Sequence, residues 1–396
     1  MTIAVVGGGI AGLGSVHALS RRHGVELFDD GPHPGGHART VDVGGLAVDT
    51  GFLVYNEVNY PRLTGLFGEL GVCTQPTVMS FSVECGCGIA WSSRRPWRAG
   101  PRLLREILRF LRTAQPRDDD HRTLDELVSA EGYSESFRRH YLMPMTSALW
   151  SAAPETALRM PASFVLSFFH NHGMLGLRRR RWRTVVGGSR SYVAALLARS
   201  GVVVHAARVE SLSRDESGVT VAAEDGTLRR FAAAVIATSA PRALALLADP
   251  SDDERRVLGS FRTTANETVL HTDARFLPRR RGDRSAWNHR AAHCGTASPL
   301  PTVTYSANRL QRLAADAEYC ITLNRTAEID PGSVIAVHAD EHPQMTLESH
   351  AVQAELPVLN GPRRTAFAGA WQGYGFHEDG LVSGLRAAAA LEEVLA

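Results

Sequence analysis

The sequence contains no lysine, so its 43 basic residues are all arginine. Without a lysine, the chain has no side-chain amine that condenses with a carbonyl group and no ammonium that acts as a general base after losing its proton. Schiff-base chemistry on the protein is therefore excluded, and so is any mechanism that depends on a catalytic lysine.

Cysteine is also scarce, with five residues at irregular positions: Cys73, Cys85, Cys87, Cys294 and Cys320. This number is too small for a disulfide framework, and the N-terminus lacks the basic region of a secretory signal, so we expect a cytoplasmic protein. Cys85 and Cys87 form a close pair, but no second Cys or His pair lies at zinc-ligand spacing around it. The sequence therefore predicts no metal site.

Long apolar runs and a strong net charge are missing as well. No stretch approaches ~18 consecutive apolar residues, so no spanning helix is expected. The formal net charge is only +2, which gives no argument for nucleic-acid binding. No internal repeat with a period of about 20 to 50 residues is present, which argues against solenoids and propellers. With 44% hydrophobic residues in 396, the chain can bury a large core in two or three domains.

The glycine-rich segment near the N-terminus is the most specific feature that is present. Residues 3–6 form a short apolar run typical of a buried strand, and the motif Gly7-Gly8-Gly9-Ile10-Ala11-Gly12 follows directly. Gly7 permits a tight turn, Gly9 lets the backbone approach a pyrophosphate, and Gly12 lets the following helix pack closely. The motif predicts a dinucleotide whose diphosphate lies at the N-terminus of that helix.

A second strand and an acidic residue strengthen this prediction. Residues 25–28 predict a strand that ends at Asp29, from which a carboxylate accepts hydrogen bonds from ribose hydroxyls. Because the motif occurs with a strand before it, a helix after it and an acid about 20 residues on, it is much more specific than a lone glycine motif.

Later segments indicate that the nucleotide-binding domain is interrupted. Residues 202–204, 209–213 and 219–223 predict short strands, and 232–237 predict a buried one. We expect an α/β fold, α+β overall, in which a Rossmann-like cofactor-binding domain is interleaved with a mixed α+β substrate domain. The predicted domains are listed here: residues 1–82, 183–252 and 356–396 bind the cofactor, and residues 83–182 and 253–355 form the substrate domain.

Three further segments carry a resemblance to a known superfamily. Gly35-Gly36-His37-Ala38-Arg39-Thr40 follows Asp29, Asp49-Thr50-Gly51 comes next, and residues 367–388 read FAGAWQGYGFHEDGLVSGLRAA. These segments resemble the pyrophosphate-contacting, flavin-cradling and closing motifs of the FAD-dependent amine oxidase and phytoene desaturase superfamily. In the closing motif a helix N-terminus faces the flavin, where it stabilises negative charge. The resemblance implies FAD, and the lack of a cysteine near the closing motif implies that it is held non-covalently.

The glycine motif and the resemblance together imply the following cofactor-binding residues: Gly7, Gly9, Ile10, Ala11, Gly12, Asp29, Gly36, His37, Arg39, Thr50, Gly51, Phe52, Val209, Gly369, Phe376, His377 and Leu381. Segments such as DTGFLVYN, NHGML and GYGFHEDGL are also similar to a bacterial subfamily of predicted FAD-binding proteins. Members of that subfamily are often encoded beside methyltransferases that resemble cyclopropane-fatty-acid synthases, which implies lipid substrates.

The departures from the superfamily pattern concern the same sites. His37 stands where amine oxidases carry an arginine, which leaves either Arg39 or the backbone to contact the phosphates. Phe376 occupies the position of a tyrosine beside the flavin, and the lysine that binds a water at flavin N5 is missing. These departures argue against amine oxidation. A second dinucleotide motif is absent, so we expect oxygen or another electron acceptor rather than a nicotinamide partner.

Several polar or aromatic residues are candidates for the substrate cavity, each with the alternative of an ordinary packed or capping role: Tyr55, Asn56, Asn171, His172, Trp287, Tyr305 and Phe376. The catalytic residues themselves remain unknown from the sequence. The backbone amides of His377 and Glu378 are expected to contact the flavin, and an unperturbed His377 would titrate near neutrality.

Residues 91–117 hold eight arginines and one glutamate and include a predicted helix over 102–115. Its apolar stripe is expected at Leu104, Ile107, Leu108 and Leu111. One interpretation is an interfacial helix that makes peripheral contact with an anionic membrane. The alternative, which the composition favours, is a helix packed on the substrate domain with solvated arginines.

These observations predict an FAD-dependent oxidoreductase that removes a hydride from a carbon of a largely apolar, lipid-like or acyl-like substrate, giving desaturation or double-bond isomerisation. Such a reaction depends on positioning and on the exclusion of water, so it needs no obvious catalytic base. Two alternatives stay open: a flavin amine oxidase, and a flavin-binding protein that associates with a membrane or a partner without turnover.

Overall fold

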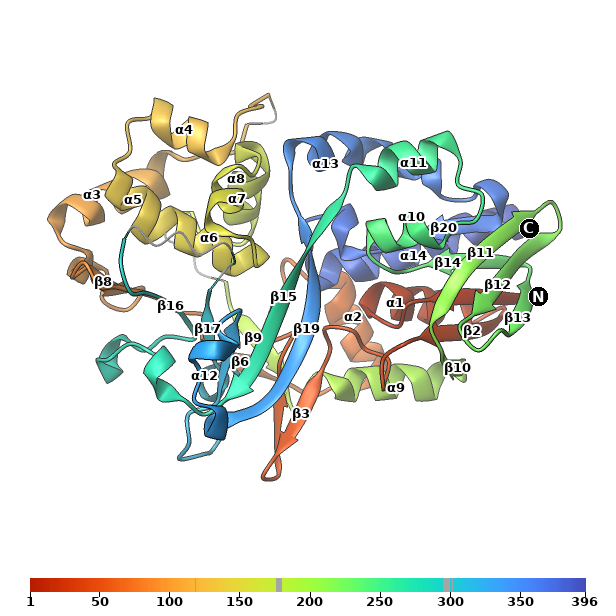
Figure 1. Cartoon of the computed structure of the whole chain (residues 1–396), viewed down its shortest axis with the longest axis horizontal. Coiled ribbons are helices and arrows are strands. Elements are labelled where there is room, and N and C mark those ends of the chain that lie inside the picture. Colours follow the sequence, from red (N-terminus) through yellow and green to blue (C-terminus); the bar gives the residue numbers. More distant parts are fainter. Residues whose placement is uncertain (118, 176–179, 295–299, 301) are drawn as a thin grey trace.

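The computed structural model describes the whole chain except residues 118, 176–179, 295–299 and 301 (Figure 1). The described residues form a mixed α+β structure in two halves, with the chain passing between them several times. The expected fold class is confirmed. The two long strands β15 and β19 run between the halves in Figure 1, and both labelled termini lie at the end of the nucleotide-binding half.

A parallel five-stranded sheet forms the centre of the nucleotide-binding half. Its strand order is β10-β2-β1-β14-β20, and every neighbouring pair is parallel. The strands are β1 (Thr2–Val6), β2 (Gly24–Asp29), β10 (Val203–Ala206), β14 (Ala233–Ile236) and β20 (Thr365–Phe367). Sequence patterns predicted β1, β2, β10 and β14, because strands of a parallel sheet are short and almost continuously apolar.

Alternate residues of β1 point to opposite faces of this sheet and enter two different cores. Ile3 and Val5 pack with four helices: α1 (Ile10–Leu19), α2 (Pro61–Leu70), α9 (Arg190–Ser200) and α14 (His377–Leu395). Ala4 and Val6 pack with a three-stranded antiparallel sheet and two helices: β11 (Val209–Asp215), β12 (Gly218–Ala223), β13 (Leu228–Phe231), α10 (Ala240–Leu246) and α11 (Asp252–Gly259). The parallel sheet is therefore buried on both sides.

Helices α1 and α14 approach each other through glycines. A Cβ atom on Gly384 would lie 2.0 Å from the carbonyl oxygen of Ala11, and one on Gly14 would lie 2.9 Å from the Leu381 side chain. The Ser15 hydroxyl donates a hydrogen bond of 3.0 Å to the Gly384 carbonyl. Since only glycine fits at such a distance, these residues fix the first and last helices of the chain together.

The substrate half is built on a seven-stranded sheet of order β19-β15-β18-β17-β16-β7-β8. Its strands are β7 (Phe81–Cys85), β8 (Ala90–Ser92), β15 (Arg262–His271), β16 (Trp287–Ala291), β17 (Thr304–Ser306), β18 (Cys320–Leu323) and β19 (Val334–Gln344). Only β7 and β16 pair in parallel within this sheet. The first and last residues of the β15–β19 pairing are Arg262 with Gln344 and His271 with Val334.

The helices of this half lie beside the sheet and share one large core with it. They are α3 (Pro101–Thr113), α4 (Leu124–Ala130), α5 (Glu135–Phe137), the π-helical turn η2 (Arg138–Leu142), α6 (Met143–Trp150), α7 (Pro154–Leu158), α8 (Ala162–Asn171) and α12 (Ala307–Gln311). A further helix, α13 (Leu347–Val352), follows β19, and its Val352 packs against the core on the nucleotide-binding sheet. Two small sheets complete the fold: β3 (Thr40–Val43) with β4 (Leu46–Asp49), and β5 (Tyr55–Asn56), β9 (Trp182–Val185) and β6 (Thr74–Thr77).

The predicted helix over 102–115 is present as α3, and the predicted apolar stripe is right only in part, since Ile107 is buried and Leu111 packs against the core. The helix buries Leu103, Ile107 and Phe110, whereas Leu108 is 47% exposed. Apolar residues occur on adjacent faces of this helix. The face that carries Phe110 enters the core, where its ring packs against Phe137.

The predicted domain boundaries remain a prediction. One observation bears on the boundary at residue 252: Val257 and Leu258 of α11 belong to the core on the nucleotide-binding sheet. Among the described helices, none is long and apolar enough to cross a membrane.

Candidate functional site

A cavity of about 1710 Å³, counted with its open mouth, lies where the two halves meet. Residues that directly follow three parallel strands line it: Gly9 after β1, residues 237–239 after β14 and residues 369–371 after β20. Ligands of open α/β sheets bind outside the carboxyl ends of the strands in this way. The space open to water-sized groups is about 340 Å³, which lies within the ~300–1,000 Å³ of ordinary small-molecule pockets.

The three motif glycines have different surroundings. Gly7 has a φ of +104°, and a Cβ atom there would lie 2.6 Å from the Ala237 carbonyl oxygen. A Cβ on Gly12 would lie 1.9 Å from the Gly7 carbonyl oxygen. A Cβ on Gly9, in contrast, would have no heavy atom within 4 Å. The protein itself therefore requires glycine at 7 and 12, whereas Gly9 faces space that only a ligand would fill.

Asp29 ends β2 beside this turn. Its carboxylate accepts hydrogen bonds from the amides of Gly8 at 2.6 Å and Gly31 at 3.1 Å. Burial raises the pKa of Asp29 above its ordinary value, while these two hydrogen bonds act in the opposite direction. A carboxylate has about four acceptor positions, so two remain for hydroxyl groups of a ligand.

Arg39 lies away from the cavity lining and is already paired. Its guanidinium donates two hydrogen bonds of 2.9 Å to the Asp340 carboxylate on β19, and its Nε donates to the Thr50 hydroxyl at 3.0 Å. Burial alone would raise the pKa of Asp340, but the Arg39 contacts hold it well below the ordinary range. Of the two alternatives for the phosphates, this geometry favours the backbone over Arg39.

The segment from His37 to Phe52 forms the floor of the cavity. The Phe52 amide donates to the His37 carbonyl at 2.6 Å, and a Cβ on Gly51 would lie 2.3 Å from the same oxygen. Behind them, Asp49 accepts hydrogen bonds from the Ser189 amide and hydroxyl, both at 2.8 Å. Burial raises the pKa of Asp49 to about 6. Asp49 thus supports the floor without lining the cavity.

The N-terminus of α14 points its first amides at the cavity. The Asp379 carboxylate caps the helix by accepting from the Phe376 amide at 2.9 Å, and burial raises its pKa to about 6. The His377 ring stacks on Phe52 with centroids 3.8 Å apart and is hydrogen-bonded to the Tyr192 hydroxyl at 2.8 Å. Burial, with a further contribution from His37, lowers the pKa of His377 to about 3. The expectation that His377 titrates near neutrality is therefore wrong, because the fold places the ring out of water.

Two observations test whether these residues fit FAD. The space beside Gly9 is where a diphosphate would meet the N-terminus of α1. Nε2 of His37, in the cavity lining, is buried and has no hydrogen-bond partner within the described chain. A buried polar atom without a partner is costly, and a polar cofactor atom would supply one. The residues present therefore fit the predicted cofactor.

Aromatic and aliphatic side chains form the substrate side of the cavity. Phe376 stacks on Phe168 with centroids 4.8 Å apart, and Trp150 lies against both rings. Trp287 and Tyr305 meet edge to face at 5.0 Å across the ends of β16 and β17. The other apolar lining residues on this side are Leu53, Val54, Met79, Ala148, Leu149, Trp182 and Leu323.

The structure brings some of the predicted residues into the cavity lining and leaves others behind it. Predicted residues that line the cavity are Gly9, Ile10, Ala11, Gly36, His37, Thr50, Gly51, Phe52, Trp287, Tyr305, Gly369, Phe376 and His377. Predicted residues outside the lining are Gly7, Gly12, Asp29, Arg39, Tyr55, Asn56, Asn171, His172, Val209 and Leu381.

Of the cavity candidates outside the lining, Tyr55, Asn56 and His172 are buried and Asn171 is exposed. His172 stacks on the inner side of Phe168 at 3.8 Å, its Nδ1 contacts the Phe168 carbonyl oxygen at 3.0 Å, and burial lowers its pKa to about 4. The side-chain oxygen of Asn56 accepts from the Asn59 amide at 2.9 Å. Val209 is 3% exposed and belongs to the core beside the nucleotide-binding sheet.

Sequence reasoning missed several lining residues, among them Met79, Leu149, Phe168, Trp182 and Leu323. They come from five segments of the chain that meet only in the folded protein. Their residue types are those of any core, so no local pattern distinguishes them from packed residues.

Comparison with known proteins agrees with this geometry. The model of the family described as flavin-containing amine oxidoreductase matches residues 10–391. Comparison with curated proteins gives no match. Solved structures of similar fold include cyclohexylamine oxidase from Brevibacterium oxydans IH-35A, which is 17% identical with a TM-score of 0.72 over 100% of this chain and 99% of that one.

Two other similar structures differ in what their titles name. A fatty acid isomerase from P. acnes that produces CLA is 14% identical, with a TM-score of 0.71 over 98% of this chain and 97% of that one. Putrescine oxidase bound to putrescine is 13% identical, with a TM-score of 0.72 over 99% of each chain. At these identities the likeness shows the fold alone. Because the family model spans nearly the whole chain, however, this protein belongs to the flavin-containing amine oxidoreductase family and is an FAD-dependent oxidoreductase.

Proposed function

We propose that this oxidoreductase removes a hydride from a carbon of a largely apolar, acyl-like substrate, giving desaturation or double-bond isomerisation. The observation that carries the proposal is the composition of the substrate side of the cavity, which combines aromatic and aliphatic side chains. The aromatic ones are Phe168, Trp182, Trp287, Tyr305 and Phe376. Burial of an acyl chain against such a wall is worth roughly 0.8 kcal/mol per CH₂ group. The wall thus supplies binding energy and excludes water at the same time.

The charged groups of the described lining argue against an ammonium substrate. Two carboxylates occur there: Asp340 is paired with Arg39, and Glu341, which accepts from the Ser239 hydroxyl at 2.9 Å, is exposed. Neither is a buried, unpaired anion. A buried cation needs a partner of opposite charge or several strong acceptors. A neutral chain needs neither.

Two histidines of the lining stay neutral at physiological pH. Burial lowers the pKa of His342 to about 3, as it does for His377. Their imidazoles therefore act as fixed hydrogen-bonding groups and not as sources of protons. The chain's contribution to the reaction is then to orient the substrate carbon and to keep water away from it.

We place the cofactor across the floor of the cavity. In this arrangement the diphosphate meets Gly9 and the first amides of α1, the ribose hydroxyls meet Asp29, and the ring system meets the N-terminus of α14. Bound FAD supplies the acceptor for the hydride. The amides at the start of α14 favour the negative charge that accompanies this transfer.

Amine oxidation is the second candidate, and the family membership with its cyclohexylamine and putrescine oxidase neighbours supports it. Anaerobic mixing separates the two. Purified holoprotein is mixed with unsaturated fatty acids in one series and with cyclohexylamine and putrescine in another, while the oxidised flavin absorbance is followed. We expect bleaching with the fatty acids, or a shifted double bond by mass spectrometry when the hydride returns. Bleaching by the amines alone would refute the acyl proposal.

A charge placed in the cavity tests the proposed binding wall. Leu149 lines the cavity, whereas Leu108 is 47% exposed on α3, so Leu149→Glu and Leu108→Glu make the same change in different surroundings. We expect Leu149→Glu to lower kcat/KM for the fatty acid at least tenfold, about 1.4 kcal/mol, and Leu108→Glu to leave it unchanged. FAD content should be the same in both variants.

The electron acceptor depends on the outcome of the reaction. Desaturation needs oxygen or another acceptor, whereas isomerisation returns the electrons to the product. Oxygen uptake in step with product formation supports desaturation, and product formation without oxygen uptake supports isomerisation.

Contact with a membrane through 91–117 is weakly supported. The apolar stripe of α3 is used in the core, which favours the packed interpretation, although Trp97 is 63% exposed beside solvent-facing arginines. Flotation with anionic liposomes tests this surface. We expect that the protein does not float with the liposomes. If wild type does float, and the variant with Arg102, Arg105 and Arg112 replaced by glutamine does not, the interfacial interpretation is supported.

A further inference from the structure

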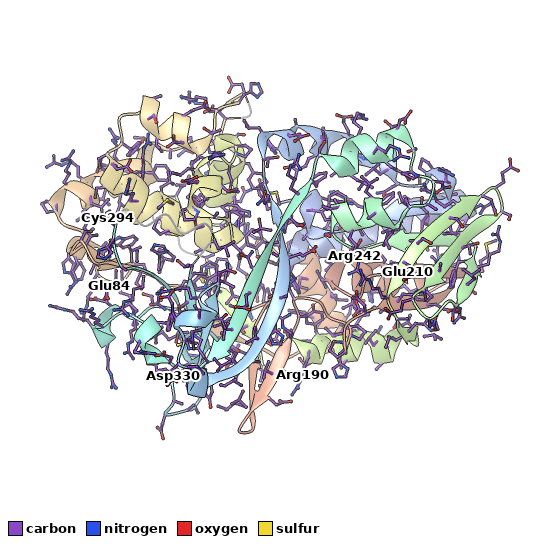
Figure 2. The ribbon with its side chains drawn as sticks, in the orientation of Figure 1. Glu84, Arg190, Glu210, Arg242, Cys294 and Asp330 are labelled. Atoms are coloured by element: carbon purple, nitrogen blue, oxygen red, sulfur yellow. The ribbon has the colours of Figure 1, made fainter. Side chains whose placement is uncertain are left out.

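Three cysteines and a histidine meet at one edge of the substrate half. They are Cys85 at the end of β7, Cys87 in the following turn, His140 in the π-helical turn η2, and Cys294 beyond the end of β16. Their sulfur and nitrogen atoms all lie within 4.8 Å of one another. Figure 2 shows Cys294 near Glu84 on the substrate half, well away from Arg242 and Glu210 in the nucleotide-binding half.

We propose that Cys85, Cys87, His140 and Cys294 bind one zinc ion that fixes the substrate half of the cavity. Four protein ligands with three sulfurs and one imidazole nitrogen form a common structural zinc set. Thiols lose their protons to solvent when zinc binds, so coordination requires no oxidant or reductant.

Three of the six distances between the ligand atoms are close to those of a tetrahedral ion, and all six are within 4.8 Å. With Zn–S near 2.3 Å and Zn–N near 2.0–2.1 Å, a regular tetrahedron places sulfur atoms about 3.8 Å apart and sulfur and nitrogen about 3.6 Å apart. The observed separations are 3.6 Å between Cys85 and Cys294, 3.4 Å from Cys87 to Nε2 of His140, and 3.7 Å from Cys294 to the same nitrogen. A group of this size holds a single ion and not an iron–sulfur cluster.

The second ring nitrogen of His140 is held as it is in known zinc sites. Its Nδ1 lies 3.1 Å from the Ser136 carbonyl oxygen, which selects the tautomer whose Nε2 lone pair faces the sulfurs. The His140 carbonyl in turn accepts a hydrogen bond of 2.8 Å from the Trp91 indole. Both contacts fix the position of the ligand before any metal arrives. Single π-helical turns of this kind are frequent at functional sites.

Backbone geometry brings the two cysteine segments together. β7 and β16 run in parallel with Cys85 opposite Ala291, and the Gly86 amide donates to the Ala291 carbonyl at 3.0 Å. A Cβ on Gly86 would lie 1.8 Å from the Ala292 carbonyl oxygen, so only glycine fits between the two cysteines of the pair. The residue type at 86 is thus explained by the close approach of the segment that carries Cys294.

Charge around the group also suits the proposal. Three thiolates and Zn²⁺ sum to one negative charge, and the Arg139 guanidinium donates a hydrogen bond to the Cys294 carbonyl oxygen beside the ligands. Arg139 also pairs with Glu135, so its positive charge is shared between that carboxylate and the cysteine group.

The proposed ion connects elements that form the cavity wall. β16 carries Trp287 at the cavity and reaches the cysteine group at its other end, and η2 leads directly into α6, which carries Leu149. The sequence predicted no metal site because no second ligand pair lies at short spacing, whereas His140 and Cys294 are 53 and 207 residues beyond Cys87. We therefore expect zinc to affect the rigidity of the substrate half and not the binding of FAD.

Metal analysis of the full-length holoprotein, purified without chelators from zinc-supplemented medium, tests the proposal. We expect about one zinc per chain in wild type. The zinc content should be at least tenfold lower in Cys87→Ser, Cys294→Ser and His140→Gln. Cys73→Ser is the matched control because Cys73 is an exposed cysteine outside the group. FAD per chain should stay constant in all of them. Zinc-free wild-type protein, or equal zinc in the three variants and the control, would overturn the proposal.

If the variants do not fold, cobalt substitution of the wild-type protein provides a second test. Wild-type protein grown with cobalt should show the intense visible bands of tetrahedral cobalt and a thiolate-to-cobalt charge-transfer band in the difference spectrum against the zinc form. Octahedral, weakly absorbing cobalt would contradict the ligand set. A disulfide that joins Cys294 to Cys85 or Cys87 in non-reducing peptide mapping of fresh protein would also refute it.

Discussion

Replacement of Gly9 by alanine should separate cofactor binding from folding. Gly9 has a φ of −69° and a ψ of 178°, which alanine adopts freely, and a Cβ there meets no atom of the protein. The variant without FAD should therefore be more stable than wild type by about 0.4–1 kcal/mol, because alanine restricts the unfolded chain. The same methyl group occupies the space assigned to the diphosphate, so we expect the Kd for FAD to rise at least tenfold, by about 1.4 kcal/mol.

These two effects reverse the order of stability when FAD is added. At an FAD concentration of about 100 times the wild-type Kd, binding stabilises wild type by about 2.7 kcal/mol and a tenfold weaker variant by about 1.4 kcal/mol. The variant should then be less stable than wild type by roughly 0.3–0.9 kcal/mol. Urea unfolding with and without FAD measures both differences, and flavin fluorescence titration gives the Kd.

Gly12→Ala is the contrasting variant. Its Cβ would lie 1.9 Å from the Gly7 carbonyl oxygen, so it should destabilise the FAD-free protein by about 1–3 kcal/mol. If Gly9→Ala binds FAD within twofold of wild type, the space beside Gly9 is not used by the cofactor and the reasoning fails.

Three further predictions concern buried charges and the attachment of the flavin. The folded-state pKa of His377, about 3, lies below the ordinary value of 6.5, so the unfolded chain takes up a proton first and stability falls as the pH drops through this window. His377→Gln should flatten the pH dependence of the unfolding free energy by up to about 1.4 kcal/mol per pH unit between those values, and an unchanged slope in urea unfolding would contradict the burial of this ring. Asp340→Asn should destabilise the protein by about 1–3 kcal/mol at pH 7, because Arg39 is left with a neutral partner. The loss should shrink as the pH falls below about 3.9, and equal thermal stability of this variant and wild type at pH 7 would refute the pairing. Acid denaturation should release all FAD into the supernatant, because the five cysteines lie far along the chain from the closing motif, and colour retained in the pellet would show a covalent link.

Local sequence patterns predicted the parts of the site that consecutive residues build. The turn after β1, the strand that ends at Asp29 and the helix that follows Phe376 each depend on neighbours along the chain, and glycine at 7 and 12 is required by contacts within the same unit. Such features are visible in one sequence because the backbone itself imposes the residue types.

Features that depend on distant segments could not be predicted in the same way. The Arg39–Asp340 pair joins residues 301 positions apart, and only the fold shows that Arg39 is already occupied. The pKa of His377 depends on burial by Phe52 and Tyr192, which no local pattern reveals. On α3, the leucines allow more than one apolar stripe. The buried residues are Leu103, Ile107 and Phe110, which differ in part from the expected stripe.

The glycine contact between α1 and α14 has a consequence for the order of folding during synthesis. The helix that starts the cofactor site is made first, but its partner helix and the edge strand β20 belong to residues 365–395. A nascent chain therefore exposes the inner face of α1 until residues 365–395 have been made. FAD then binds only after these residues have folded against α1. Chains truncated before this region should remain incompletely folded and be bound by chaperones or degraded by proteases.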